Sequence, residues 1–207
     1  MSRMVIRAGL ALGAFVVVGY PLSVWYSNAH FAPDASLLIT LFPAFGLSAF
    51  TIMYLHLIGR PFAAWLDGYV SFARFERVSS YLVLVSIILH PLLRTIALVI
   101  RGISLWPSLG TELAITLGGL GFILLISYDL GKTFQHSTFV TRHWGRIDVA
   151  STLGFYVIWV HSLLLGSEVQ MGFLHSLWIF YGVSAAVASL YVFVYRPFTK
   201  VTKTAGE

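Results

Sequence analysis

Six long apolar stretches separated by charged residues constrain this chain more than any other feature of its sequence. The stretches are bounded by Arg7 and Asp34, Asp34 and Arg60, Arg77 and Arg101, Glu112 and Asp129, Asp148 and Glu168, and Glu168 and Arg196. A helix rises about 1.5 Å per residue, so about 20 apolar residues cross the roughly 30 Å hydrocarbon core of a bilayer. Because 58% of the residues are hydrophobic and only 10% are charged, the composition is that of an integral membrane protein. We therefore predict an all-α bundle of six transmembrane helices.

The predicted helices belong to one domain covering residues 1–207, and they span about residues 5–27, 35–59, 77–100, 111–129, 148–167 and 171–195. The third helix is extended past Arg94, because an arginine near a membrane interface can reach the headgroups with its long side chain. The first apolar stretch is too long for the hydrophobic region of a signal peptide, so we predict a retained helix.

The basic residues predict the orientation of the helices. If the N-terminus is cytoplasmic, all of the 13 Lys and Arg residues except Arg94 and Arg101 fall in cytoplasmic segments, as the positive-inside rule requires. Both termini are then cytoplasmic, and we predict a multi-pass protein of the cell inner (plasma) membrane, surrounded by membrane lipid. The basic residues are scattered between apolar stretches rather than gathered in a stripe, so no nucleic-acid partner is expected.

The side chains available for metal binding are limited because the chain has no cysteine. Thiolate zinc sites, iron–sulfur clusters and covalently attached haem are therefore excluded. Of the seven histidines, five are predicted to lie at an interface or in the loop between the fourth and fifth helices: His30, His56, His136, His143 and His175. The other two, His90 and His161, lie within predicted spans.

His90 and His161 are predicted to share one depth in the membrane. Each lies 13 residues after the charge that starts its helix, Arg77 and Asp148 respectively, which places both about 20 Å from the inner boundary. A buried imidazole costs a few kcal/mol unless it has a partner. One haem b with both histidines as axial ligands satisfies both rings. Alternatively, each ring bonds a backbone carbonyl or a serine such as Ser162.

Two arginines are candidates for binding the haem propionates. Arg94 lies four residues after His90, so it shares the same helix face one turn closer to the outer surface. There it can donate charge-assisted hydrogen bonds to a propionate, and Arg101 can serve in the same way. The alternative for both is an ordinary arginine that reaches the headgroups.

Two segments resemble a known family. The segments "RVSSYLVLVSIILHPLLR" and "RHWGRIDVASTLGFYVIWVHS" resemble the ferric-reductase-like transmembrane domain of NADPH oxidases, metalloreductases and the haem-binding membrane subunit of the methionine-sulfoxide reductase system. The likeness covers roughly residues 35–200. It implies electron transfer across the membrane, from a cytoplasmic flavin through b-type haem held by histidines of the third and fifth helices, to an acceptor outside.

The sequence departs from family members that hold two haems. Those members carry a second histidine pair 13 or 14 residues before the outer one, where this chain has Glu76, Arg77 and Asp148. One haem is therefore expected, with an Arg77–Asp148 salt bridge or a flavin ring in the inner place.

The chain holds no Gly-rich phosphate loop of its own, since "LGGLGF" (117–122) lies within a predicted helix and is typical of close helix packing. The electron donor would be a separate flavin-containing reductase, quinol or another membrane subunit. This interpretation makes the chain an electron-transfer subunit of an oxidoreductase rather than a complete enzyme. The alternatives are a haem-free structural or assembly subunit on the same scaffold, or a transporter with a proton path.

Overall fold

Helices make up most of the described chain. The computed structural model describes residues 2–29, 31, 36–104, 110–134, 136–170 and 172–197, and within these ranges it has no β-strand. The long helices are α1 (Arg3–Asn28), α2 (Ser36–Gly59), α4 (Phe72–Ile100), α5 (Glu112–Thr133), α6 (Thr138–Leu165) and α7 (Gly172–Leu190). The short elements are η1 (Arg60–Phe62), α3 (Ala63–Leu66), η2 (Ser167–Val169) and the π-helical η3 (Tyr191–Tyr195). His30, Lys200 and Lys203 lie outside the described residues.

The six long helices are each long and apolar enough to cross a membrane. They confirm the predicted all-α fold with six candidate spans, whereas the cytoplasmic location of the termini stays a prediction. Two helices begin earlier than expected, α4 at Phe72 and α6 at Thr138. The reason is that a charged residue ends an apolar stretch without ending a helix. At α4 the start is set instead by Ser71, whose Oγ accepts a hydrogen bond from the Arg74 N–H at 3.3 Å.

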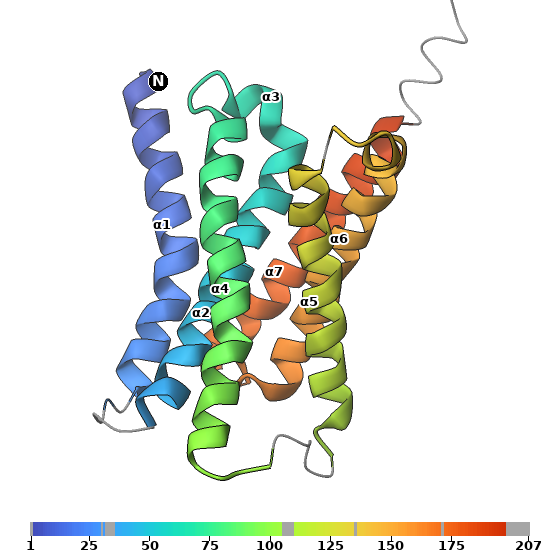
Figure 1. Ribbon diagram of the computed structural model, residues 1–207. Helices are drawn as coiled ribbons and strands as arrows, with labels where there is room; N and C mark the ends of the chain where they lie inside the picture. The colour runs from blue at the N-terminus through green and yellow to red at the C-terminus, as the bar shows by residue number, and fades with distance from the viewer. Residues whose placement is uncertain are drawn as a thin grey trace, which may run out of the picture.

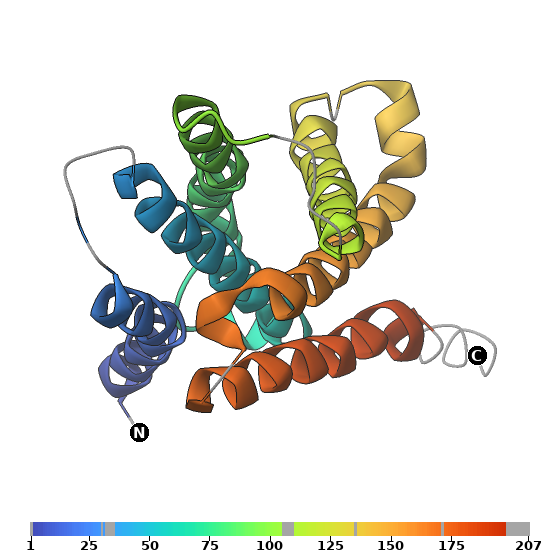
Figure 2. The same cartoon turned by 90° about the horizontal axis from the view of Figure 1, so that it is seen from below.

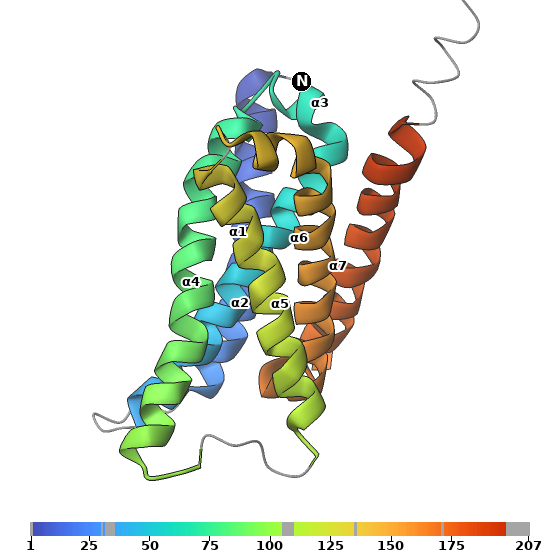
Figure 3. The ribbon, with the colours of Figure 1, turned by 45° about the vertical axis from the view of Figure 1, so that its right-hand side comes forward.

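Two antiparallel helix pairs form the bundle (Figure 1). Helix α2 packs along α4, and α5 packs along α6, while α1 and α7 both contact α2. We call the end where α1 begins and η3 ends the N-terminal end, and the opposite one the far end. Helices α4 and α5 touch at few positions, and they stand apart at the far end (Figures 2 and 3).

A stack of three aromatic rings joins the pairs at the centre of the molecule. The Phe50 ring of α2 lies 4.7 Å from that of Phe155 on α6 and 4.3 Å from that of Trp178 on α7, and both contacts are stacked. All three side chains are at most 2% exposed. Such ring pairs add about 0.5–1.5 kcal/mol each to the burial of apolar area. The stack therefore joins α2, α6 and α7 at the centre of the bundle.

Candidate functional site

His90 projects from α4 against the backbone of α2. Its Nδ1 lies 2.8 Å from the carbonyl oxygen of Phe42, and the Phe42 ring is 5.2 Å from the imidazole. A Cβ atom at Gly46 would come within 2.8 Å of the same Nδ1, closer than real Cβ atoms approach. The ring can therefore lie against α2 only because residue 46 has no side chain.

His161 repeats this arrangement in the other helix pair. It projects from α6 against α5, and its Nδ1 lies 2.6 Å from the carbonyl oxygen of Ala114. A Cβ atom at Gly118 would lie 2.7 Å from Cε1 and 2.8 Å from Nδ1. In both helix pairs the glycine lies four residues, about one helical turn, after the residue whose carbonyl accepts the hydrogen bond. Each imidazole occupies the space that a side chain at this glycine position would fill.

The carbonyl partners determine which nitrogen carries the proton. A carbonyl oxygen can only accept, so Nδ1 of both histidines must donate, which leaves the Nε2 lone pair of the neutral ring available. Among the described residues neither Nε2 has a hydrogen-bond partner. An Nδ1–H bonded to a backbone carbonyl is also how proteins usually orient a histidine that binds metal through Nε2. The carbonyl bonds foreseen as an alternative to haem ligation are thus present, and they are compatible with ligation.

The four predicted site residues lie on two helices, with His90, Arg94 and the C-cap residue Arg101 on α4 and His161 on α6. Arg94 is half-buried on the same helix as His90. Arg101 is exposed at the C-cap of α4, and no described contact joins it to either histidine. Ser162, the other partner considered for His161, instead accepts a hydrogen bond from Trp178 Nε1 at 2.7 Å.

The glycine that supports His161 can be tested against its neighbour. Gly118→Ala forces the imidazole away from the Ala114 carbonyl. We expect the free energy of unfolding to fall by about 1–3 kcal/mol, as for other overpacked sites. At Gly119 a Cβ atom would meet nothing within 4 Å, so Gly119→Ala should be neutral or stabilise the helix by up to about 1 kcal/mol. Unfolding in mixed micelles, followed by tryptophan fluorescence, measures both. Equal losses in the two variants would contradict a specific role for Gly118.

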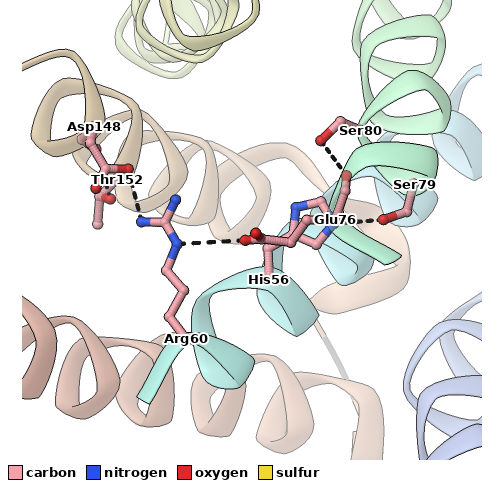
Figure 4. A network of polar contacts seen from close by, with 7 residues as sticks. All are labelled: His56, Arg60, Glu76, Ser79, Ser80, Asp148 and Thr152. Carbon is pink, nitrogen blue, oxygen red and sulfur yellow. Dashed lines mark hydrogen bonds and ion pairs between the residues drawn. The ribbon is translucent and has the colours of Figure 1, made fainter. Parts of the chain in front are cut away.

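A second polar cluster lies at the N-terminal end of the bundle, around Arg60 (Figure 4). The Arg60 Nη1 atom is 2.9 Å from Asp148 Oδ1, and its Nε atom is 3.8 Å from Glu76 Oε1. The three side chains are each little more than one-fifth exposed. Despite the short distance, the buried Oδ1 of Asp148 receives no well-aligned hydrogen bond. Arg60 thus connects α4 and α6 through charge.

This cluster corrects one prediction. Asp148 pairs with Arg60 and not with Arg77, which is exposed on α4. The chain turns directly after α2, where η1 begins at Arg60 and Pro61 occupies its first turn. That turn places the Arg60 guanidinium between α4 and α6. Spacing along the sequence could not show this, because the pairing depends on where α2 ends relative to two other helices.

His56 also takes part in the cluster. It was predicted to lie at an interface, but its Nε2 lies 2.7 Å from Ser79 Oγ on α4. Ser79 Oγ in turn donates to the Phe75 carbonyl at 2.6 Å. Because that hydroxyl proton is already used, His56 Nε2 is the donor to Ser79. The sequence did hold an indication of this, because residues four apart, such as His56 and Arg60, lie on the same side of a helix.

A cavity extends from this cluster toward the centre of the bundle. It encloses about 590 Å³ of space not occupied by atoms, its open mouth included. Its polar lining is His56, Arg60, Glu76, Ser80, Tyr128, Asp129, Lys132, Ser151 and Thr152, and its apolar lining is Met53, Leu57, Val83, Ile87, Leu125 and Phe155. The apolar part thus reaches Ile87, one turn before His90. Neither of the two described cavities is lined by His90 or His161.

The packing prediction for "LGGLGF" is met by the structure. Gly118 faces His161, and a Cβ atom at Gly121 would lie 2.6 Å from the Ile158 side chain. Sequence reasoning did not connect these glycines, or Gly46, with the histidines. These glycines could have been found by searching each neighbouring span for a glycine at the same predicted depth as the histidine.

Comparisons with protein-family models, with curated proteins and with solved structures found no match.

Proposed function

We propose that the chain binds one b-type haem through His90 and His161 and carries electrons across the membrane. The observation that carries this proposal is the repeated arrangement of the two histidines. Each Nδ1 is bonded to a backbone carbonyl, each ring lies against a glycine, and each Nε2 has no partner among the described residues. Both rings therefore have the tautomer and the uncommitted Nε2 that an axial ligand requires.

The residues present fit the axial ligation of a haem. When bound, haem b would supply a one-electron couple of its iron in a medium of low dielectric constant. His90 and His161 would hold the iron, and the carbonyls of Phe42 and Ala114 would keep their tautomer and orientation. Arg94 would hold a propionate by charge-assisted hydrogen bonds. Arg101 would do so only if the exposed end of α4 turned toward the site.

The N-terminal end is the proposed side of electron entry. Its cavity reaches Ile87 on α4, one turn before His90, and holds ionisable side chains from four elements. Two-haem members of the family that the sequence resembles carry a second histidine pair where this chain has Glu76 and Asp148, which form ion pairs with Arg60. The sequence predicted a salt bridge or a flavin ring in the inner place. Because ion pairs are present there, a flavin ring would bind in the adjoining cavity. The donor is proposed to be a separate flavin-containing reductase, quinol or another membrane subunit.

A reduced-minus-oxidised absorption spectrum of the purified full chain, expressed with sufficient haem supply, tests the proposal. We expect the bands of a low-spin b-type haem and one haem per chain. A folded protein without these bands would contradict the proposal and favour the second candidate, a haem-free structural or assembly subunit. The observation that favours this second candidate is the ion-paired N-terminal end, where Arg60 joins α4 and α6 through Glu76 and Asp148.

A further inference from the structure

A shallow basic hollow, more open than enclosed and lined by residues of α6 alone, lies away from both polar sites. Four of its lining residues, Arg142, Arg146, Val149 and Leu153, follow one another at spacings of three or four, so they share one face of the helix. Gly145 and Ala150 complete the lining. The first two side chains are cationic and the next two are apolar, so the hollow is polar at one end and apolar at the other.

The cationic end of the hollow has no compensating charge in the part of the chain that the structure describes. Neither Arg142 nor Arg146 makes an ion pair there. Asp148, the carboxylate nearest in sequence, faces the bundle interior and pairs with Arg60. Two like charges one helical turn apart destabilise an isolated helix slightly. An anion bound between them would remove this repulsion.

The length of α6 and the charges in its first three turns favour a position for the hollow at the boundary of the bilayer. The helix has 28 residues and is therefore about 42 Å long, about 12 Å more than the hydrocarbon core. Its first turns, which carry Arg142 and Arg146, then lie at headgroup level. Val149 and Leu153 are 42% and 55% exposed and lie on the lipid side below them. At Gly145 a Cβ atom would meet nothing within 4 Å, so the glycine leaves the hollow open.

We propose that this hollow binds an anionic phospholipid. The phosphate lies between the guanidinium groups of Arg142 and Arg146, which form charge-assisted hydrogen bonds with it. An acyl chain runs along Val149 and Leu153. Basic pockets at the membrane interface bind acidic headgroups in this way. The proposal does not depend on haem binding, because it uses neither histidine.

Lipid titrations of the full chain in detergent, followed by native mass spectrometry, test this site. Phosphatidylglycerol and phosphatidylcholine with the same acyl chains are the two probes, and we expect wild type to prefer phosphatidylglycerol. The double variant Arg142→Gln/Arg146→Gln should bind phosphatidylglycerol about 25-fold more weakly, from about fivefold for each arginine. Gly145→Leu keeps both charges and fills the hollow, and it should also weaken binding.

The matched control removes the same charge from the same end of another helix. Arg74 and Arg77 are exposed on α4, and Arg74→Gln/Arg77→Gln should leave the preference for phosphatidylglycerol intact. An equal loss in this control would overturn the proposal, because binding would then follow overall charge. Equal affinity of wild type for the two lipids would also overturn the proposal, as would undiminished phosphatidylglycerol binding by Gly145→Leu. Displacement of phosphatidylglycerol by inorganic phosphate at equal concentration would overturn it too.

Discussion

Replacing either His90 or His161 by alanine removes the low-spin haem spectrum of the purified protein, if the proposed function is correct. Each variant loses one of the two axial ligands. Substitution of a residue that only hydrogen-bonds to a metal ligand already lowers metal affinity about 10–100-fold. We therefore expect haem affinity to fall by more than about 100-fold. Absorption spectra and haem-to-protein ratios of variants purified side by side give the measurement.

The control for this experiment is His56→Ala. His56 is also half-buried and bonded within the bundle, so its removal perturbs packing to a similar degree without touching the proposed ligands. We expect its spectrum to match that of wild type. Loss of the low-spin bands in His56→Ala, with retention in His90→Ala, would show that the assignment of ligands is wrong.

Replacing Arg60 by glutamine destabilises the bundle by about 2 kcal/mol. The substitution leaves Asp148 and Glu76 without their cation. The three side chains are partly buried, so the cost lies between that of a surface pair, below about 1 kcal/mol, and that of a broken buried pair, about 3–5 kcal/mol. Reversible unfolding in mixed micelles measures the free energy of unfolding.

A double-mutant cycle separates the ion pair from the loss of Arg60 packing. Arg60→Gln/Asp148→Asn removes both charges, so we expect it to cost less than the sum of the single variants. Arg77→Gln, at the position that the sequence suggested for the salt bridge, should change stability by less than about 0.5 kcal/mol. Additive effects in the cycle, or a larger loss in Arg77→Gln than in Arg60→Gln, would contradict the observed pairing.

The two helix boundaries that differ from expectation show where sequence reasoning fails. The spans were bounded at Arg77 and Asp148 because charge is costly in hydrocarbon, yet the helices begin at Phe72 and Thr138. Backbone hydrogen bonding continues into the interface, where charged side chains have water. Hydropathy therefore locates the part of a helix that lies in the membrane, and at α4 the Ser71 N-cap locates its start.

The sequence by itself determined that the chain forms six long apolar helices and that His90 and His161 lie within two of them. The reason is that helix length and side-chain polarity are local properties, which a bilayer sorts by depth. Only the tertiary structure decided which groups meet. It paired Asp148 with Arg60, placed His56 on Ser79, and set His90 and His161 against Gly46 and Gly118. These contacts depend on the rotation and offset of helices that are far apart in the chain, which a linear pattern does not contain.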